Sequence, residues 1–261
     1  MTSPISATGA GASAAPAQQV ANPPFVPSAT PEQDAARARM FAQLDGLDVR
    51  RFVSEKEVRD ALLERHGAAT QAKLDAASVA ICGCGGLGST VAIALARIGV
   101  GHMHLIDFDV VDMTNLNRQQ YSVWHVGQPK PVALRQVIAS INPYLDVRID
   151  CTKVTDDNVR DLLAGDAIVA ECFDVPENKT FLVNAVLENF PDKPLVSASG
   201  MAGYRSSNLI STRRVARNFY FCGDGETAPK PGAGLMAPRV GVVAAHEANM
   251  ITRIILGEDD A

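Results

Sequence analysis

Short apolar runs and helix-type periodicities alternate along the middle of the chain. Runs typical of buried strands cover residues 79–82, 103–107, 167–173 and 194–199, and residues 145–151 alternate apolar with polar positions. Between them, apolar residues recur at helical spacing over residues 89–98, 132–141, 155–163 and 177–189. This β-α-β order predicts an α/β fold: a Rossmann-like, mostly parallel sheet with helices on both faces.

The pattern changes after the last of these strands. Residues 206–213 and 215–221 favour a small antiparallel extension of the sheet. Residues 222–238 are rich in glycine and proline and predict a loop, and a loop of this length in a compact domain is usually functional or mobile. Residues 240–256 predict a long closing helix.

Two segments precede the first strand. Residues 1–40 are rich in Ala, Pro, Ser and Gly and show no apolar period, which predicts a disordered tail. Residues 54–74 predict a helical lead-in whose first helix is capped by Ser54. We therefore expect a single domain over residues 41–261.

Composition narrows the classes of function. The 261 residues carry a formal net charge of −5 and no Lys/Arg-rich block, so nucleic acid is not the expected main partner. No apolar run approaches the roughly 18 residues of a membrane span, and the N-terminus lacks the pattern of a secretory signal. Five cysteines, an odd number, favour reduced thiols and a cytoplasmic location.

A glycine-rich turn follows the first apolar run. Its glycines are Gly83, Gly85, Gly86 and Gly88, of which the first, second and fourth fit G-x-G-x-x-G. Asp107 follows about 20 residues later, as a ribose-binding acid should. Glycine lets the backbone approach phosphate closely, and a helix starting near Ser89 would direct its N–H groups at that phosphate. The motif predicts a nucleotide site; the alternative is a glycine turn without a ligand.

Polar residues follow the predicted strands at the edge where such a site would lie. They are Asp107 and Asp109 after the second strand, Asn115, Arg118 and Lys130 in the next loop, and Asp174 after a later strand. Ligands of open α/β sheets bind outside the carboxyl ends of the strands, so these groups can share one pocket. Arg and Lys neutralise phosphate oxygens and a carboxylate holds Mg²⁺, which favours a nucleoside triphosphate over a nicotinamide cofactor. Taken singly, each residue could instead form a surface ion pair.

The same residues carry a resemblance to a known family. Over roughly residues 55–257, five motifs resemble, in order, those of the ThiF/MoeB/HesA group of E1-like adenylyltransferases. They are Gly83-Cys-Gly-Gly-Leu-Gly-Ser, Asp107-Phe-Asp, Asn115-Leu-Asn-Arg-Gln, Gly127-Gln-Pro-Lys130 and Asp174. Three further stretches look like the short ThiF family 2 branch, which is linked to thiamine biosynthesis: Ser199-Gly-Met-Ala-Gly-Tyr, Cys222-Gly-Asp-Gly and Gly234-Leu-Met-Ala-Pro-Arg-Val-Gly.

The resemblance implies a role for each matched position. Gly83, Gly85, Gly86 and Gly88 match the turn that binds phosphate and adenosine, Asp107 matches the ribose-binding acid, and Asn115, Arg118 and Lys130 match the triphosphate contacts. Asp174 matches the acid that serves Mg²⁺. The implied catalytic residues are Arg118, Lys130 and Asp174, and the implied cofactors are ATP and Mg²⁺.

The resemblance also implies a reaction and a partner. The family uses ATP to adenylate the C-terminal glycine carboxylate of a ubiquitin-like sulfur carrier, with release of pyrophosphate. The first expectation is therefore a homodimeric enzyme that acts on a ThiS-like carrier in thiamine (thiazole) biosynthesis. Alternatives within the family are a MoaD-like carrier or a tRNA threonylcarbamoyl-adenosine dehydratase. Alternatives of another class are a non-catalytic module that binds nucleotide or carrier, and a nicotinamide-dependent dehydrogenase.

The cysteines give two further expectations. Larger relatives bind structural zinc with two C-x-x-C pairs, and this chain contains no C-x-x-C, so no zinc is expected. Cys222 falls between an apolar strand and Gly-Asp-Gly, a loop setting that makes it a candidate accessible thiol for sulfur handling. The alternative is an inert residue, since no nearby cation is present to lower the pKa of its thiol.

Overall fold

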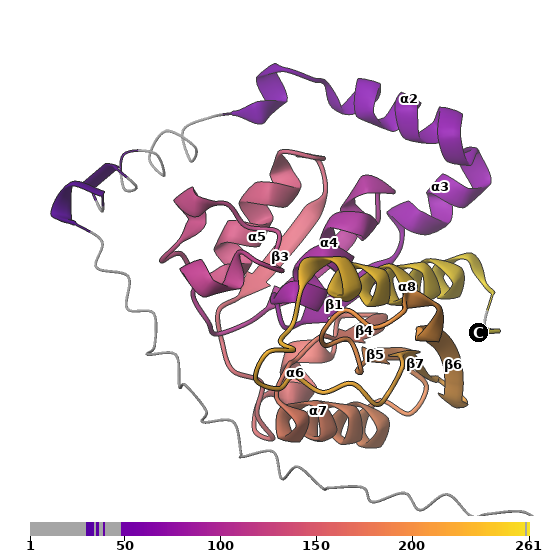
Figure 1. Cartoon of the computed structure of the whole chain (residues 1–261). Coiled ribbons are helices and arrows are strands. Elements are labelled where there is room, and N and C mark those ends of the chain that lie inside the picture. Colours follow the sequence, from indigo (N-terminus) through magenta and orange to yellow (C-terminus); the bar gives the residue numbers. More distant parts are fainter. Residues whose placement is uncertain (1–29, 34, 37–38, 40–47, 259) are drawn as a thin grey trace, which may run out of the picture.

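The structure is a computed structural model that describes residues 30–33, 35–36, 39, 48–258 and 260–261. Within the tail expected over residues 1–40, the stretches 31–33 and 35–36 are helical, which its composition did not predict (Figure 1). Most of that tail, and the domain boundary expected at residue 41, lie outside the described residues.

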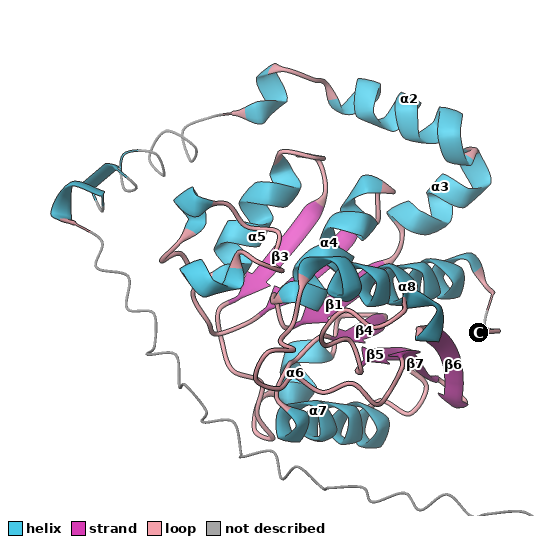
Figure 2. Cartoon of the chain, in the orientation of Figure 1, coloured by secondary structure: helices cyan, strands magenta, loops and turns pink. Residues whose placement is uncertain are grey.

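A seven-stranded sheet forms the centre of the fold (Figure 2). Its strands are β1 (Ser78–Cys82), β2 (His102–Ile106), β3 (Asp146–Asp150), β4 (Ile168–Glu171), β5 (Leu195–Ala198), β6 (Ser211–Ala216) and β7 (Phe219–Gly223). Their order is β3-β2-β1-β4-β5-β7-β6, and all neighbours are parallel except β6 and β7. The predicted Rossmann-like sheet with a small antiparallel extension is confirmed.

Helices cover both faces of this sheet (Figure 1). One face packs against α4 (Gly86–Arg97), α5 (Lys130–Ala139) and α8 (Ala237–Leu256), and the other against α6 (Val159–Leu163) and α7 (Pro176–Asn189). Each face has its own apolar cluster, in which Leu95 and Leu134 are fully buried on the first side and Leu163 and Leu182 on the second. Among the described residues, no helix has both the length and the apolar character needed to cross a bilayer.

The lead-in forms the two helices α2 (Glu55–His66) and α3 (Ala68–Asp75). Ser54 caps α2 as predicted: its hydroxyl accepts a hydrogen bond from the Glu57 amide, and the Glu57 carboxylate accepts one from the Ser54 amide. Helix α2 buries none of its residues, whereas α3 packs against α8 (Figure 1). The lead-in is therefore attached to the domain mainly through α3.

Several boundaries in the second half of the chain differ from the prediction. Residues Ser207–Leu209, expected to be part of a strand, form a 3-10 helix, so β6 begins at Ser211. Strand β6 continues to Ala216, past the predicted break near residue 214, because Arg214 hydrogen-bonds the Arg217 carbonyl and closes the hairpin turn there. Helix α8 begins at Ala237 rather than at residue 240, since Pro238 is compatible with the first turn of a helix. Periodicity alone does not show these effects.

A buried ion pair fixes the loops around the start of α8. Nη2 of Arg239 lies 2.6 Å from Oδ2 of Asp224, and the two side chains are 3% and 6% exposed. Arg239 also donates to the carbonyl oxygens of Arg205 and Ser206. Burial alone would raise the pKa of Asp224, but hydrogen bonds from two backbone amides, the Thr227 hydroxyl and Arg239 lower that pKa to about 2. The pair thus ties two loop segments to α8.

Replacing Arg239 with methionine should lower the free energy of unfolding by about 3–5 kcal/mol, because the buried Asp224 carboxylate loses its partner. Urea titration at pH 7 measures the change. The exposed Arg217→Met variant is the control and should differ from wild type by less than about 0.5 kcal/mol. Because the pKa of Asp224 is lowered, its contribution is complete above about pH 4 and is lost as the pH falls toward 2. Wild-type stability of Arg239→Met at pH 7 would contradict the assignment.

Candidate functional site

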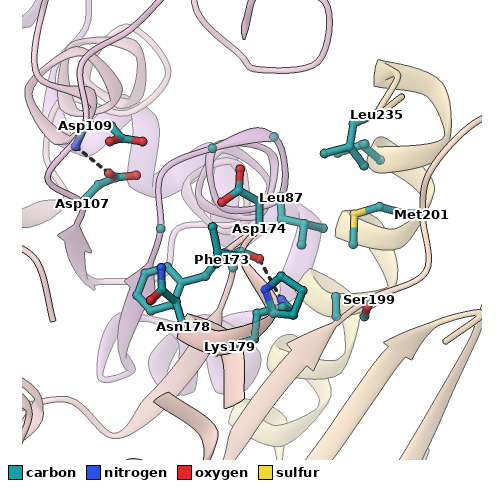
Figure 3. A pocket seen from close by; sticks show the side chains of 18 of the residues that line it. Leu87, Asp107, Asp109, Phe173, Asp174, Asn178, Lys179, Ser199, Met201 and Leu235 are labelled. Carbon is teal, nitrogen blue, oxygen red and sulfur yellow. Dashed lines mark hydrogen bonds between the residues drawn. The ribbon is translucent and has the colours of Figure 1, made fainter. Parts of the chain in front are cut away.

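A cavity of about 520 Å³ lies at the carboxyl ends of β1, β2, β4 and β5 (Figure 3). Eight of the ten predicted site residues line it: Gly83, Gly85, Gly86, Asp107, Asn115, Arg118, Lys130 and Asp174. The other two, Gly88 and Cys222, do not. Segments far apart in the sequence therefore converge on one site, as the strand-end argument predicted.

The glycines of the turn differ in how closely other protein atoms approach the position of a Cβ. A Cβ at Gly83 would lie 2.9 Å from the carbonyl oxygen of Cys172, and one at Gly88 would lie 1.7 Å from the carbonyl oxygen of Gly83. These two glycines are required by the fold itself. At Gly85 the nearest neighbour of such a Cβ is 3.8 Å away, on the Gln119 side chain. The space beside Gly85 is thus open to a ligand rather than filled by protein.

Helix α4 begins at Gly86, one turn before the predicted start near Ser89. Glycine has a low helix propensity, but packing of α4 against α8 outweighs it here. Gly85 is the N-cap residue, and no side chain caps the helix. The amides of Gly86 and Leu87 have no acceptor among the described residues, and both residues line the cavity. These free amides and the positive end of the helix dipole suit an anion.

Asp107, after β2, holds the glycine turn in place. Its Oδ2 accepts a hydrogen bond from the Cys84 amide at 2.7 Å, and its Oδ1 accepts one from the Asp109 amide at 2.8 Å (Figure 3). Burial raises the pKa of this carboxyl, and the nearby Lys130 and the two amides partly offset that rise. Asp107 also lines the cavity, so a hydroxyl-bearing ligand meets an acceptor that is anchored to the turn.

Four cationic residues line the cavity, namely Arg118, Lys130, Lys153 and Lys179, and the two that the sequence predicted are in different states. Lys130, the first residue of α5, is buried and forms a 2.7 Å ion pair with Asp109. Arg118 is half-buried and donates through one nitrogen to the Asn117 side chain at 3.0 Å and to the Thr114 carbonyl at 3.4 Å. Its other guanidinium nitrogens have no acceptor among the described residues. Arg118 therefore retains donors for an anionic ligand.

Asp174 presents an exposed carboxylate to the cavity (Figure 3). Within the described part of the chain this carboxylate forms no hydrogen bond or ion pair, and no cluster of three or more potential metal ligands occurs. Mg²⁺ is usually held by one or two carboxylates together with substrate phosphates and water. Asp174 therefore fits a Mg²⁺ ion that arrives with a nucleotide, rather than one held in a cage of protein ligands.

Part of the cavity wall was not predicted from the sequence. Residues 152–154 follow β3, residues 199–201 follow β5, and residues 227–229 come from the glycine-rich loop. Their position directly after strands was the available signal for the first two segments. Gln119 is a further polar lining residue; its Oε1 is buried and accepts no hydrogen bond from the described residues.

The expectation that Cys222 is an accessible thiol is wrong. Cys222 lies inside β7, opposite Ala198 of β5, and is fully buried. Burial raises the pKa of its thiol to about 12, and the nearby Glu247 contributes to the rise. A buried, protonated thiol is unsuited to sulfur handling. Of the five cysteines, Cys151 is the exposed one.

Residues 58–261 match the model of the ThiF family. The chain is 31% identical over 214 residues to the adenylyltransferase and sulfurtransferase MOCS3 of Culex quinquefasciatus, covering 77% of this chain and 47% of that protein. It is 31% identical over 205 residues to the adenylyltransferase and sulfurtransferase UBA4 of Saccharomyces cerevisiae (74% and 45%). The chain thus spans about half the length of these relatives. It is 34% identical over 183 residues to the molybdopterin-synthase adenylyltransferase of Salmonella typhimurium (68% and 72%).

Solved structures share the fold. The ATP complex of the E. coli tRNA N6-threonylcarbamoyladenosine dehydratase TcdA matches with a TM-score of 0.71 and 23% identity, over 79% of this chain and 97% of that one. E. coli MccB in complex with AMPCPP and MccA matches with a TM-score of 0.56 and 22% identity, over 89% and 73%. At such identities the likeness extends to the fold alone. From the family model and the 34% identical relative, the chain belongs to the ThiF family of E1-like proteins.

Proposed function

We propose that this chain is an ATP-dependent adenylyltransferase that activates the C-terminal carboxylate of a ubiquitin-like sulfur carrier. The observation that supports this most is the convergence of an open helix N-terminus, Arg118, Lys130 and the free Asp174 carboxylate on one cavity. The names of the relatives, all adenylyltransferases, point the same way. A nicotinamide cofactor needs neither a carboxylate for Mg²⁺ nor two cations around its phosphates.

The reaction brings two anions together. An oxygen of the carrier carboxylate attacks the α-phosphorus of ATP, the bond from that phosphorus to the β-phosphate oxygen breaks, and pyrophosphate leaves with the bond's electrons. Arg118, Lys130 and the amides of Gly86 and Leu87 reduce the repulsion and stabilise charge that develops on the phosphate oxygens. No protein side chain acts as a nucleophile, because the carrier supplies it.

Asp174 is the residue that would hold Mg²⁺. The ion, when bound with ATP, neutralises phosphate charge and so favours departure of pyrophosphate. Lys130 is paired with Asp109, so a phosphate that binds there competes with that carboxylate for the ammonium group. Asp107 anchors the ribose end through the same carboxyl that holds the glycine turn.

The carrier is the finer part of the proposal. A ThiS-like carrier, and with it thiamine biosynthesis, is favoured by the likeness of residues 199–204, 222–225 and 234–241 to the short ThiF branch. A MoaD-like carrier is the second candidate, because the Salmonella relative is named for molybdopterin synthase. The resemblance to the family also leads us to propose a homodimer.

The Asp174→Asn variant should lose ATP–pyrophosphate exchange by about 10²-fold or more, because the several kcal/mol of charge stabilisation supplied by the metal are lost. The assay uses Mg²⁺ and purified ThiS-like and MoaD-like carriers in separate reactions. Thermal unfolding should be unchanged, since the side chain is exposed and has no partner among the described residues. Carrier-independent exchange, or absence of exchange with both carriers in protein that binds ATP, would reject the proposed function.

The Gly85→Ala variant should bind ATP at least about tenfold more weakly, a change of about 1.4 kcal/mol, because the methyl group occupies the space open to the ligand. The fold should persist, since φ at this residue is −78° and no protein atom is crowded. Gly165→Ala is the matched control, with an equally open Cβ position outside the cavity. Calorimetric titration with ATP measures both variants, and equal affinities in the two would refute the phosphate-binding role of the turn.

A further inference from the structure

A buried charge pair lies at the end of β4, and its lysine also lines the cavity, but the pair has no part in the chemistry proposed above. Oε2 of Glu171 is 2.8 Å from Nζ of Lys179, and the side chains are 0% and 15% exposed. Glu171 is the last residue of β4 and Lys179 lies in the first turns of α7. Ser197 of β5 adds a third group, since its hydroxyl donates to the same Oε2 at 2.6 Å.

The two charged side chains hydrogen-bond the backbone N–H and the backbone C=O of Phe173. Oε1 of Glu171 accepts a hydrogen bond from the Phe173 amide at 2.8 Å. Nζ of Lys179 donates to the Phe173 carbonyl oxygen at 2.8 Å (Figure 3). The N–H and the C=O of Phe173 are therefore fixed by opposite ends of the same ion pair.

Phe173 directly precedes Asp174, so its carbonyl belongs to the peptide bond that carries Asp174. The Asp174 side chain has no hydrogen-bond partner among the described residues, and its carboxylate is therefore placed only through its backbone. Four residues separate the end of β4 from the start of α7, and this short connection contains both Phe173 and Asp174.

A contribution to stability does not by itself explain this pair, because the free-energy cost of removing two charges from water offsets much of their attraction. Both charged groups instead make further hydrogen bonds, and one bond from each goes to the backbone beside a free carboxylate that lines the cavity. We infer that Glu171, Lys179 and Ser197 are positioning residues that fix the Phe173 peptide and thereby aim Asp174 at the metal-bound phosphates. This inference rests on the proposed function for the identity of its ligand, Mg·ATP.

The test measures ATP binding by calorimetry with Mg²⁺ and with EDTA, for wild type, Lys179→Met and Lys179→Arg. In Lys179→Met the strengthening of ATP binding by Mg²⁺ should fall by about tenfold, the effect typical of losing a residue that orients a metal ligand. ATP affinity in EDTA should be unchanged. Lys179→Arg keeps the charge and the donors and should restore most of the Mg²⁺ effect.

A second measurement needs no ligand. Amide hydrogen exchange at Phe173 and Asp174 in the free protein should be faster in Lys179→Met than in wild type, and close to wild type in Lys179→Arg. Ser197→Ala, which leaves the ion pair in place, should act in the same direction with a smaller effect and serves if Lys179→Met does not fold.

Three results would overturn the inference. One is a Lys179→Met or Ser197→Ala protein with lowered thermal stability but a wild-type Mg²⁺ effect, which indicates a structural role only. Another is weaker ATP binding by Lys179→Met than by wild type in EDTA, which indicates that Lys179 contacts the phosphates directly. The third is unchanged exchange at Phe173. Because binding and exchange are read without a carrier, failure of adenylation in the wild type would reject the proposed function and leave this inference standing.

Discussion

The approach of the glycine turn to the end of β4 is the contact on which the site depends. Gly83 donates to the Ile106 carbonyl of β2 at 2.8 Å, and its Cα faces the Cys172 carbonyl so closely that no Cβ fits. Gly88 meets the Gly83 carbonyl in the same way and brings α4 onto the turn. These contacts join the ends of β1, β2 and β4, and the start of α4 with its free amides follows from them.

The acids around this contact divide into two groups. Asp107 and Glu171 are buried and accept hydrogen bonds from backbone amides at the ends of neighbouring strands. Burying a charge is unfavourable unless it is paired or hydrogen-bonded. Asp107 meets this condition through its hydrogen bonds, and Glu171 through its hydrogen bonds and its ion pair with Lys179. Asp174 is exposed and unpaired within the described residues, and the half-buried Arg118 keeps guanidinium nitrogens that have no acceptor among those residues. Fixed groups thus shape the backbone of the site, and unpaired groups remain for a ligand.

The sequence predicts those parts of the site whose signal is local. The glycine turn, Asp107 and Asp174 are each adjacent to an apolar run, so topology places them together once the sheet is parallel. The start of α4 was misplaced because glycine propensity opposes a helix that tertiary packing supports. Cys222 was misplaced because β7 extends to Gly223 only through its pairing with β5 and β6, which no local pattern shows.

Glu247 is a buried acid whose carboxyl group is mostly uncharged at neutral pH. It lies on α8, fully buried, and accepts a hydrogen bond from the Cys172 thiol at 3.5 Å. Burial, with the negative charge of Glu171, raises the pKa of Glu247 to about 8, so the group is mostly protonated at neutral pH.

Because the unfolded chain loses this proton near pH 4.5, burial of Glu247 lowers stability increasingly between pH 4.5 and 8. The charge of Lys179 acts on both Glu171 and Glu247. An ionised Glu247 would add a second negative charge near the ion pair of Glu171 and Lys179. A neutral Glu247 adds no such charge near the pair whose two members hydrogen-bond the N–H and C=O groups of Phe173 beside Asp174.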